Sequence, residues 1–198
     1  MKNNIEENKY FSFTPENLKI VNAILLRYPE EQKASAVMPL LDLAMRQIGG
    51  WLTESAMKEV SKIINIPYIR VLEVASFYSM YNLKPIGKYF VQVCTTTSCW
   101  LKGSDEILNI CKKHLKIDNN QTTSDGMFTL KEVECLGACV NAPMVQINDD
   151  YYEDLDEKST KEILISLLND KPLKPGSYRM RKNTSPEKIS ISNGEKHA

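Results

Sequence analysis

The sequence predicts an α/β protein in which a helical N-terminal bundle precedes a smaller α/β domain. Two observations lead to this class. Apolar residues first recur at helical spacing in four successive segments, and residue 88 then begins a run of aromatic and β-branched residues that is typical of a strand. Residues 82–87 (NLKPIG) lie between the two patterns, so we expect a helical domain over residues 14–84 and an α/β domain over residues 85–170.

The four helices of the first domain are marked by capping residues and prolines. Thr14 is an N-cap residue followed by proline, Gly49 begins a glycine pair that ends the second helix, Thr53 caps the third and Pro67 opens the fourth. Short helices joined by tight turns favour a compact bundle. Residues 1–13, which precede it, are expected to be loosely ordered.

Aromatic residues at helical spacing are more often core residues than parts of a cofactor site, so Trp51 and Phe77 are interpreted as core. The third and fourth helices also resemble a helix-turn-helix. A DNA reader needs a basic face, whereas Glu54, Glu59 and Glu73 interrupt this one, and we therefore expect no nucleic-acid partner.

The second domain is predicted to run strand, helix, strand, strand, strand, helix, which is a small α/β sandwich. The first two strands are expected at residues 88–93 and 128–134, with a helix at about 100–115 between them. A hairpin over 144–155 and a closing helix near 161–168 follow. If the first two strands are parallel neighbours, the loops after them leave the sheet at the same edge.

Residues 171–198 form a basic tail that contains proline and serine. It holds seven Lys or Arg residues against two Glu, while the whole chain of 198 residues has zero formal charge. One interpretation is a disordered, solvated tail. The other is an arm that docks on an acidic partner surface. Residues 171–182 leave both open, and disorder is favoured beyond them.

The composition is ordinary for a soluble globular protein, with 42% hydrophobic and 25% charged residues. No run approaches the roughly 20 apolar residues of a membrane-spanning helix. The polar, acidic first residues show neither a secretory signal nor a transit peptide. We therefore expect a cytoplasmic protein without direct membrane insertion.

Four of the five cysteines form two close pairs, and each pair begins where a predicted strand ends. Cys94 and Cys99 enclose four residues, whereas Cys135 and Cys139 enclose three. If the two loops meet at one sheet edge, four thiolates could bind one inorganic centre. Cys111 lies alone on a predicted helix and is interpreted as a small buried hydrophobe.

Four interpretations of the two pairs compete. A redox disulfide is disfavoured because Cys-x-x-Cys is absent, and unliganded buried cysteines would require a chance placement at two strand ends. Four cysteines can satisfy a structural zinc ion. They can equally bind a two-iron cluster, which is wider and is stabilised by hydroxyl and backbone N–H groups near sulfur, such as those of residues 95–98. The spacing alone leaves zinc and the cluster open.

Longer runs around these cysteines resemble a known family. Residues 93–100 (VCTTTSCW) and 134–144 (ECLGACVNAPM) resemble the thioredoxin-like [2Fe–2S] ferredoxin family. Residues 40–52 and 75–81 resemble its longer members, the E subunits of bacterial NADH–quinone oxidoreductase, or complex I. The resemblance covers about residues 10–180, and cysteine fills every ligand position of the family.

The resemblance implies a thioredoxin-like domain with a mixed sheet and one [2Fe–2S] cluster. Its ligands would be Cys94, Cys99, Cys135 and Cys139, with each strand-end pair expected on one iron. Thioredoxin-like folds tend to carry a cis proline near the active-site edge, so a cis bond is predicted before Pro143.

The resemblance also implies a function. The chain would carry single electrons in respiratory electron transport, next to a flavoprotein subunit that binds FMN and NADH and with other peripheral-arm subunits at the cytoplasmic face of the inner membrane. It would be enzymatic only as a subunit, with no complete active site of its own. Two alternatives stay open: the small subunit of a soluble NAD-linked hydrogenase or formate dehydrogenase, and a structural zinc interaction module with four cysteine ligands.

Overall fold

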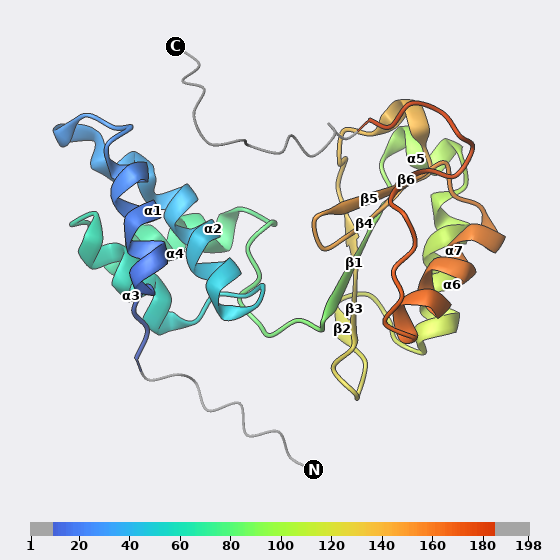
Figure 1. Cartoon of the computed structure of the whole chain (residues 1–198), viewed down its shortest axis with the longest axis horizontal. Coiled ribbons are helices and arrows are strands. Elements are labelled where there is room, and N and C mark those ends of the chain that lie inside the picture. Colours follow the sequence, from blue (N-terminus) through green and yellow to red (C-terminus); the bar gives the residue numbers. More distant parts are fainter. Residues whose placement is uncertain (1–9, 185–198) are drawn as a thin grey trace. The chain divides into compact units, whose positions relative to one another are not determined.

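The computed structural model describes residues 10–184, and its contacts divide the chain after Ile86 into two compact units (Figure 1). The sequence predicted a helical domain over residues 14–84 and an α/β domain over residues 85–170, and this division into domains stays a prediction. Within residues 10–184, none of the helices has the length and apolar character needed to cross a bilayer.

The first unit is helical. Its elements are α1 (Pro15–Leu25), a 3₁₀ segment η1 (Glu30–Ala36), α2 (Val37–Ile48), α3 (Glu54–Ile63) and α4 (Tyr68–Phe77). The side-chain oxygen of Thr14 accepts a hydrogen bond from Asn17 N at 3.2 Å, and that of Thr53 accepts one from Ala56 N at 3.1 Å. These N-caps satisfy backbone donors that a helix start leaves free. Gly49 ends α2 with φ +104°, a left-handed conformation that suits glycine.

The core of this unit excludes one residue that the sequence placed inside it. Phe77 is 80% exposed and packs edge-on against Tyr78, so the prediction that Phe77 is a core residue is wrong. Val71 and Ala75 are the buried positions of α4, and a residue two places after Ala75 points to the opposite side of a helix. Trp51, in the loop after α2, is only partly buried.

The second unit is a mixed sheet with helices. Its elements are β1 (Tyr89–Cys94), α5 (Thr97–Leu101), α6 (Ser104–Leu115), β2 (Gln121–Thr122), β3 (Phe128–Val133), a 3₁₀ turn η2 (Cys139–Asn141), β4 (Val145–Ile147), β5 (Asp150–Glu153), α7 (Glu157–Leu168) and β6 (Gly176–Ser177). The sheet order is β2-β3-β1-β4-β5-β6. Strand β1 runs parallel to β3 and antiparallel to β4, which confirms the predicted α/β class with a mixed sheet.

Helices α6 and α7 lie side by side on one face of this sheet, and their apolar residues share a core with β1, β3 and β4 (Figure 1). The single helix predicted over about 100–115 is in fact two helices. Gly103 adopts φ +92° between α5 and α6, so the chain leaves one helix axis and begins another there. This break makes α5 a separate short turn directly after β1.

The register of the two central strands positions the cysteines. Cys94 pairs with Val133 at the end of the parallel β1–β3 ladder. The loops that follow both strands therefore leave the sheet at the same edge, as the sequence predicted. The hairpin of β4 and β5 turns at Asn148, which adopts φ +54°.

Residues 171–184 are called the C-terminal strap below. Strand β6 lies in this strap and pairs in parallel with β5, placing Gly176 opposite Tyr152 and Ser177 opposite Glu153. The disordered interpretation of the basic tail does not describe these residues, because the strap packs on its own domain, whereas docking on an acidic partner surface stays a prediction. The rest of the predicted tail, residues 185–198, lies outside the described residues.

Candidate metal centre

The predicted ligands gather where β1 and β3 end. Cys94 is the last residue of β1, and Cys99 lies in α5, which follows at once. Cys135 lies two residues beyond β3, and Cys139 is the first residue of η2. Two loops far apart in sequence thus deliver their cysteines to one edge of the sheet.

The four thiols form one connected group. The sulfurs of Cys135 and Cys139 are 3.5 Å apart. The remaining pairs are linked electrostatically, because Cys94 influences the pKa of the Cys99 thiol and that of the Cys135 thiol. Within residues 10–184, no set of three or more His, Cys, Asp or Glu side chains is arranged to bind a single metal ion.

The two pairs differ in exposure. Cys94 and Cys99 are buried, whereas Cys135 and Cys139 are exposed. Burial, reinforced by the hydrogen bond with Cys94 and by repulsion from it, raises the pKa of Cys99 to about 12. The hydrogen bond from Gly137 N–H, followed by that from Cys139, lowers the pKa of Cys135. The edge thus combines an inner pair and a solvent-facing pair.

Hydrogen-bond donors lie near two of the sulfurs. Gly137 N lies 3.4 Å from Cys135 Sγ, and its φ of +82° turns the backbone into this position. Thr96 Oγ1 lies 3.5 Å from Cys94 Sγ. Thr95 was also expected near sulfur, but its hydroxyl donates to Glu132 at 2.8 Å instead. Such donors stabilise negative charge on sulfur.

A supporting layer behind the exposed pair was not predicted. The Tyr151 hydroxyl donates to Leu136 O at 2.8 Å, inside the Cys135–Cys139 loop. The side chain of Asn141 is buried and donates to Glu153 Oε2 at 2.7 Å. Both contacts link η2 and its loop to β5. The predicted hairpin over residues 144–155 includes this strand, but its pattern carries no signal of which loop the strand supports.

The edge also holds the predicted cis bond. The peptide bond between Ala142 and Pro143 is cis, which confirms the prediction. The next residue, Met144, accepts a hydrogen bond from Cys94 N at 3.4 Å through its carbonyl oxygen. The segment after η2 therefore adjoins the end of β1.

Comparison with known proteins identifies the family to which this chain belongs. The family model described as thioredoxin-like [2Fe–2S] ferredoxin matches residues 21–168, which include both cysteine pairs. This chain belongs to that family. The predicted family is thereby confirmed, and the family implies one [2Fe–2S] cluster, the predicted cofactor.

Similar proteins carry more specific names. The E subunit of the NADH-quinone oxidoreductase of Rickettsia typhi is 56% identical over 163 residues, which are 82% of this chain and 96% of that protein. NADH dehydrogenase [ubiquinone] flavoprotein 2 of Dictyostelium discoideum, a mitochondrial protein, is 54% identical over 176 residues, 89% of this chain and 71% of that one.

A solved structure shares the fold. In the NAD+-reducing [NiFe]-hydrogenase in its air-oxidised state, the match has a TM-score of 0.58 and 22% identity. It covers 67% of this chain and 23% of the hydrogenase chain. At this identity, the likeness concerns the fold alone.

The residues at the edge fit a [2Fe–2S] cluster. Four thiols from two converging loops supply the donor set that such clusters use, and the Gly137 N–H already points at one sulfur. The assignment of Cys94, Cys99, Cys135 and Cys139 as the ligands stays a prediction.

Proposed function

We propose that this protein is the [2Fe–2S] electron-carrying subunit of an NADH–quinone oxidoreductase, the respiratory complex I. The observation that carries the proposal is the 56% identity over 163 residues to the Rickettsia typhi protein, an alignment long enough to include residues of both units. The chain would act in this enzyme as a subunit, and we expect no complete active site on this chain alone.

In this proposal, Cys94, Cys99, Cys135 and Cys139 hold the cluster, and one strand-end pair binds each iron. When bound, the cluster supplies a one-electron redox couple. The buried Cys94 and Cys99 keep water from the inner side, while the exposed Cys135 and Cys139 bring the other side to the surface. The Gly137 N–H stabilises the negative charge on Cys135.

The proposed partner is the flavoprotein subunit that binds FMN and NADH, together with other peripheral-arm subunits at the cytoplasmic face of the inner membrane. Apolar side chains near the exposed cysteines support the proposal that a partner subunit covers this surface. Trp100 is 57% exposed, Leu101 71% and Val140 78%, and their elements α5 and η2 are in contact. Large exposed apolar side chains in one place indicate an interaction surface.

A matched pair of cysteine variants tests the cluster assignment. The purified full chain should contain about two iron atoms and give a rhombic EPR signal after reduction. Cys139→Ala should lose both the bound iron and the EPR signal, because one iron would lack a ligand. Cys111→Ala should keep both, since Cys111 is a core residue of α6. A chain with bound zinc and no EPR signal would instead support the zinc module.

Capture of the chain with its natural companions tests the parent complex. Co-purification with a flavin- and NADH-binding subunit and quinone-reducing activity supports the proposal. Companions that include a hydrogenase or formate dehydrogenase subunit would contradict it and support the rival complexes that share this domain.

A further inference from the structure

We propose that the C-terminal strap positions the Cys139–Asn141 turn and thereby determines how firmly the cluster is retained. In this account Arg181 and Asn141 are positioning residues that act through Cys139. The inference rests on the proposed role of Cys139 as a ligand.

The strap is bound through two adjacent buried acids at the end of β5. Glu153 is 0% exposed and Asp154 is 2% exposed. A buried carboxylate is costly unless hydrogen-bond donors or a cation satisfy it. In both cases the strap supplies donors, so the strap and the two acids stabilise one another.

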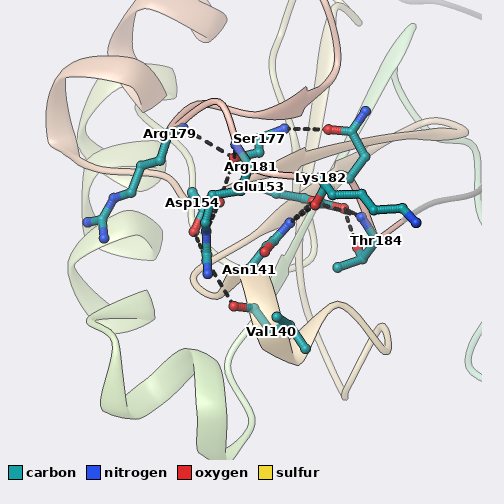
Figure 2. Close-up of polar contacts among 10 residues, drawn as sticks. Val140, Asn141, Glu153, Asp154, Ser177, Arg179, Arg181, Lys182 and Thr184 are labelled. Atoms are coloured by element: carbon teal, nitrogen blue, oxygen red, sulfur yellow. Dashed lines mark hydrogen bonds and ion pairs between the residues drawn. The ribbon is translucent and has the colours of Figure 1, made fainter.

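Glu153 joins the strap to the cysteine turn. One of its oxygens accepts from Asn141 Nδ2 at 2.7 Å. The same carboxylate accepts from the Thr184 backbone N at 3.1 Å and from the Thr184 hydroxyl. Asn141 Nδ2 also donates to Lys182 O at 2.8 Å. A single buried amide therefore bridges β5, the strap and η2 (Figure 2).

Asp154 holds the strap through Arg181. The Arg181 Nε lies 3.1 Å from Asp154 Oδ2, and a second nitrogen forms an ion pair with the other oxygen. The Ser177 hydroxyl donates to the same carboxylate at 2.6 Å. Arg181 also donates through Nη2 to Val140 O at 2.9 Å, so one guanidinium contacts both the acid and the residue that follows Cys139 (Figure 2).

These contacts hold both residues of η2 that follow Cys139. Val140 is bound through its carbonyl by Arg181, and Asn141 through its side chain and through the bond from Asp154 N to Asn141 O at 2.8 Å. Partners behind a metal ligand orient it, and their loss typically lowers metal affinity about 10–100-fold. Releasing the strap should therefore weaken the hold on the cluster at Cys139.

The test compares two arginines of the strap in the full chain. Arg181→Gln removes the contacts to Asp154 and Val140. Arg179→Gln is the matched control, because it removes the same charge two residues away, and Figure 2 shows the Arg179 guanidinium directed away from the other labelled side chains. Loss of the visible cluster spectrum under an iron chelator should be about tenfold faster or more in Arg181→Gln and unchanged in Arg179→Gln.

Two further measurements separate positioning from general instability. The conservative Arg181→Lys keeps the charge but not the planar fork, so it should lose the cluster at an intermediate rate. In the unmodified chain, the amides of Arg181, Thr184 and Asn141 should exchange with solvent more slowly when the cluster is present than when it is absent, because linkage between two sites is reciprocal.

The outcomes are distinguishable. Equal cluster loss in Arg181→Gln and Arg179→Gln overturns the role of the strap while leaving the proposed function intact. A chain without any cluster spectrum contradicts the proposed function itself. Should Arg181→Gln fail to fold, the exchange measurement decides: amide exchange in the strap that is unaffected by the cluster overturns the inference.

Discussion

The two cysteine loops at the sheet edge are stabilised in different ways. The two cysteines of the Cys94–Cys99 loop are buried, and this loop folds with local bonds, such as Trp100 N to Thr96 O at 3.0 Å and Lys102 N to Cys99 O at 3.1 Å. The Cys135–Cys139 loop is exposed and contains little regular structure. Its supports come from Tyr151, Glu153 and the C-terminal strap, which lie far along the chain.

This difference indicates where the centre is vulnerable. A loop held by its own helix turn keeps its shape as long as that turn persists. A loop held by distant side chains is weakened when any one of them is removed. We therefore expect substitutions behind Cys135 and Cys139 to affect cluster retention more than comparable substitutions elsewhere in the same sheet.

The largest effect should follow removal of the Glu153 carboxylate. Glu153→Ala leaves Asn141 Nδ2 and Thr184 N without their buried acceptor, and each unsatisfied donor costs about 1–3 kcal/mol, so a loss of about 3 kcal/mol in unfolding free energy is expected. Denaturant unfolding of the full chain measures it. Glu153→Gln keeps an acceptor oxygen, so its free energy of unfolding should fall clearly less. Equal losses in the two variants would show that the acceptor is not what matters.

A smaller effect is expected at Tyr151. Tyr151→Phe removes the 2.8 Å bond to Leu136 O and should cost about 1 kcal/mol, with faster cluster loss under a chelator. Tyr89→Phe is the matched control, because it removes a 2.7 Å bond to Asp170 at the opposite end of β1 from Cys94. It should lower stability similarly but leave cluster loss unchanged. If the two variants lost the cluster at similar rates, the contacts behind the Cys135–Cys139 loop would be no more important for cluster retention than contacts elsewhere in the sheet.

The sequence predicted that the two cysteine loops leave the sheet at one edge, because the signals for this arrangement are local. A strand pattern that runs directly into a cysteine can be read at residues 88–94 and again at 128–135, and parallel pairing of those strands then brings the loops together. The break at Gly103 was missed, because a glycine inside a helical pattern is tolerated and only its left-handed conformation reveals the bend.

The supporting layer could not be predicted, because its contacts are distant in sequence. Nothing in the local pattern around Asn141 indicates that its amide lies between Glu153 and Lys182. The composition of residues 171–182 left disorder and a docking arm both open. The order of this segment depends on two buried acids elsewhere in the chain, since they need the donors that the segment carries.

The smallest expected effect is a pH dependence at Asp154. Burial alone would raise the pKa of Asp154, but hydrogen bonds from Arg181 and Ser177 outweigh it and hold that pKa below its usual range. The folded-state pKa is thus lower than the unfolded-state value of about 3.9, so this stabilisation is fully present above about pH 4 and is lost as the pH falls through the folded-state pKa.

Thermal unfolding of the wild type and Asp154→Asn, followed by circular dichroism, measures this contribution. The unfolding temperature of the wild type should exceed that of Asp154→Asn by about 2–4 °C at pH 7, and the difference should shrink below about pH 4. A difference that stays constant across this range would mean that the paired charge contributes nothing. Because Arg181 of the strap pairs with Asp154, an acid-sensitive difference would assign this part of the pH dependence to the contact between the strap and β5.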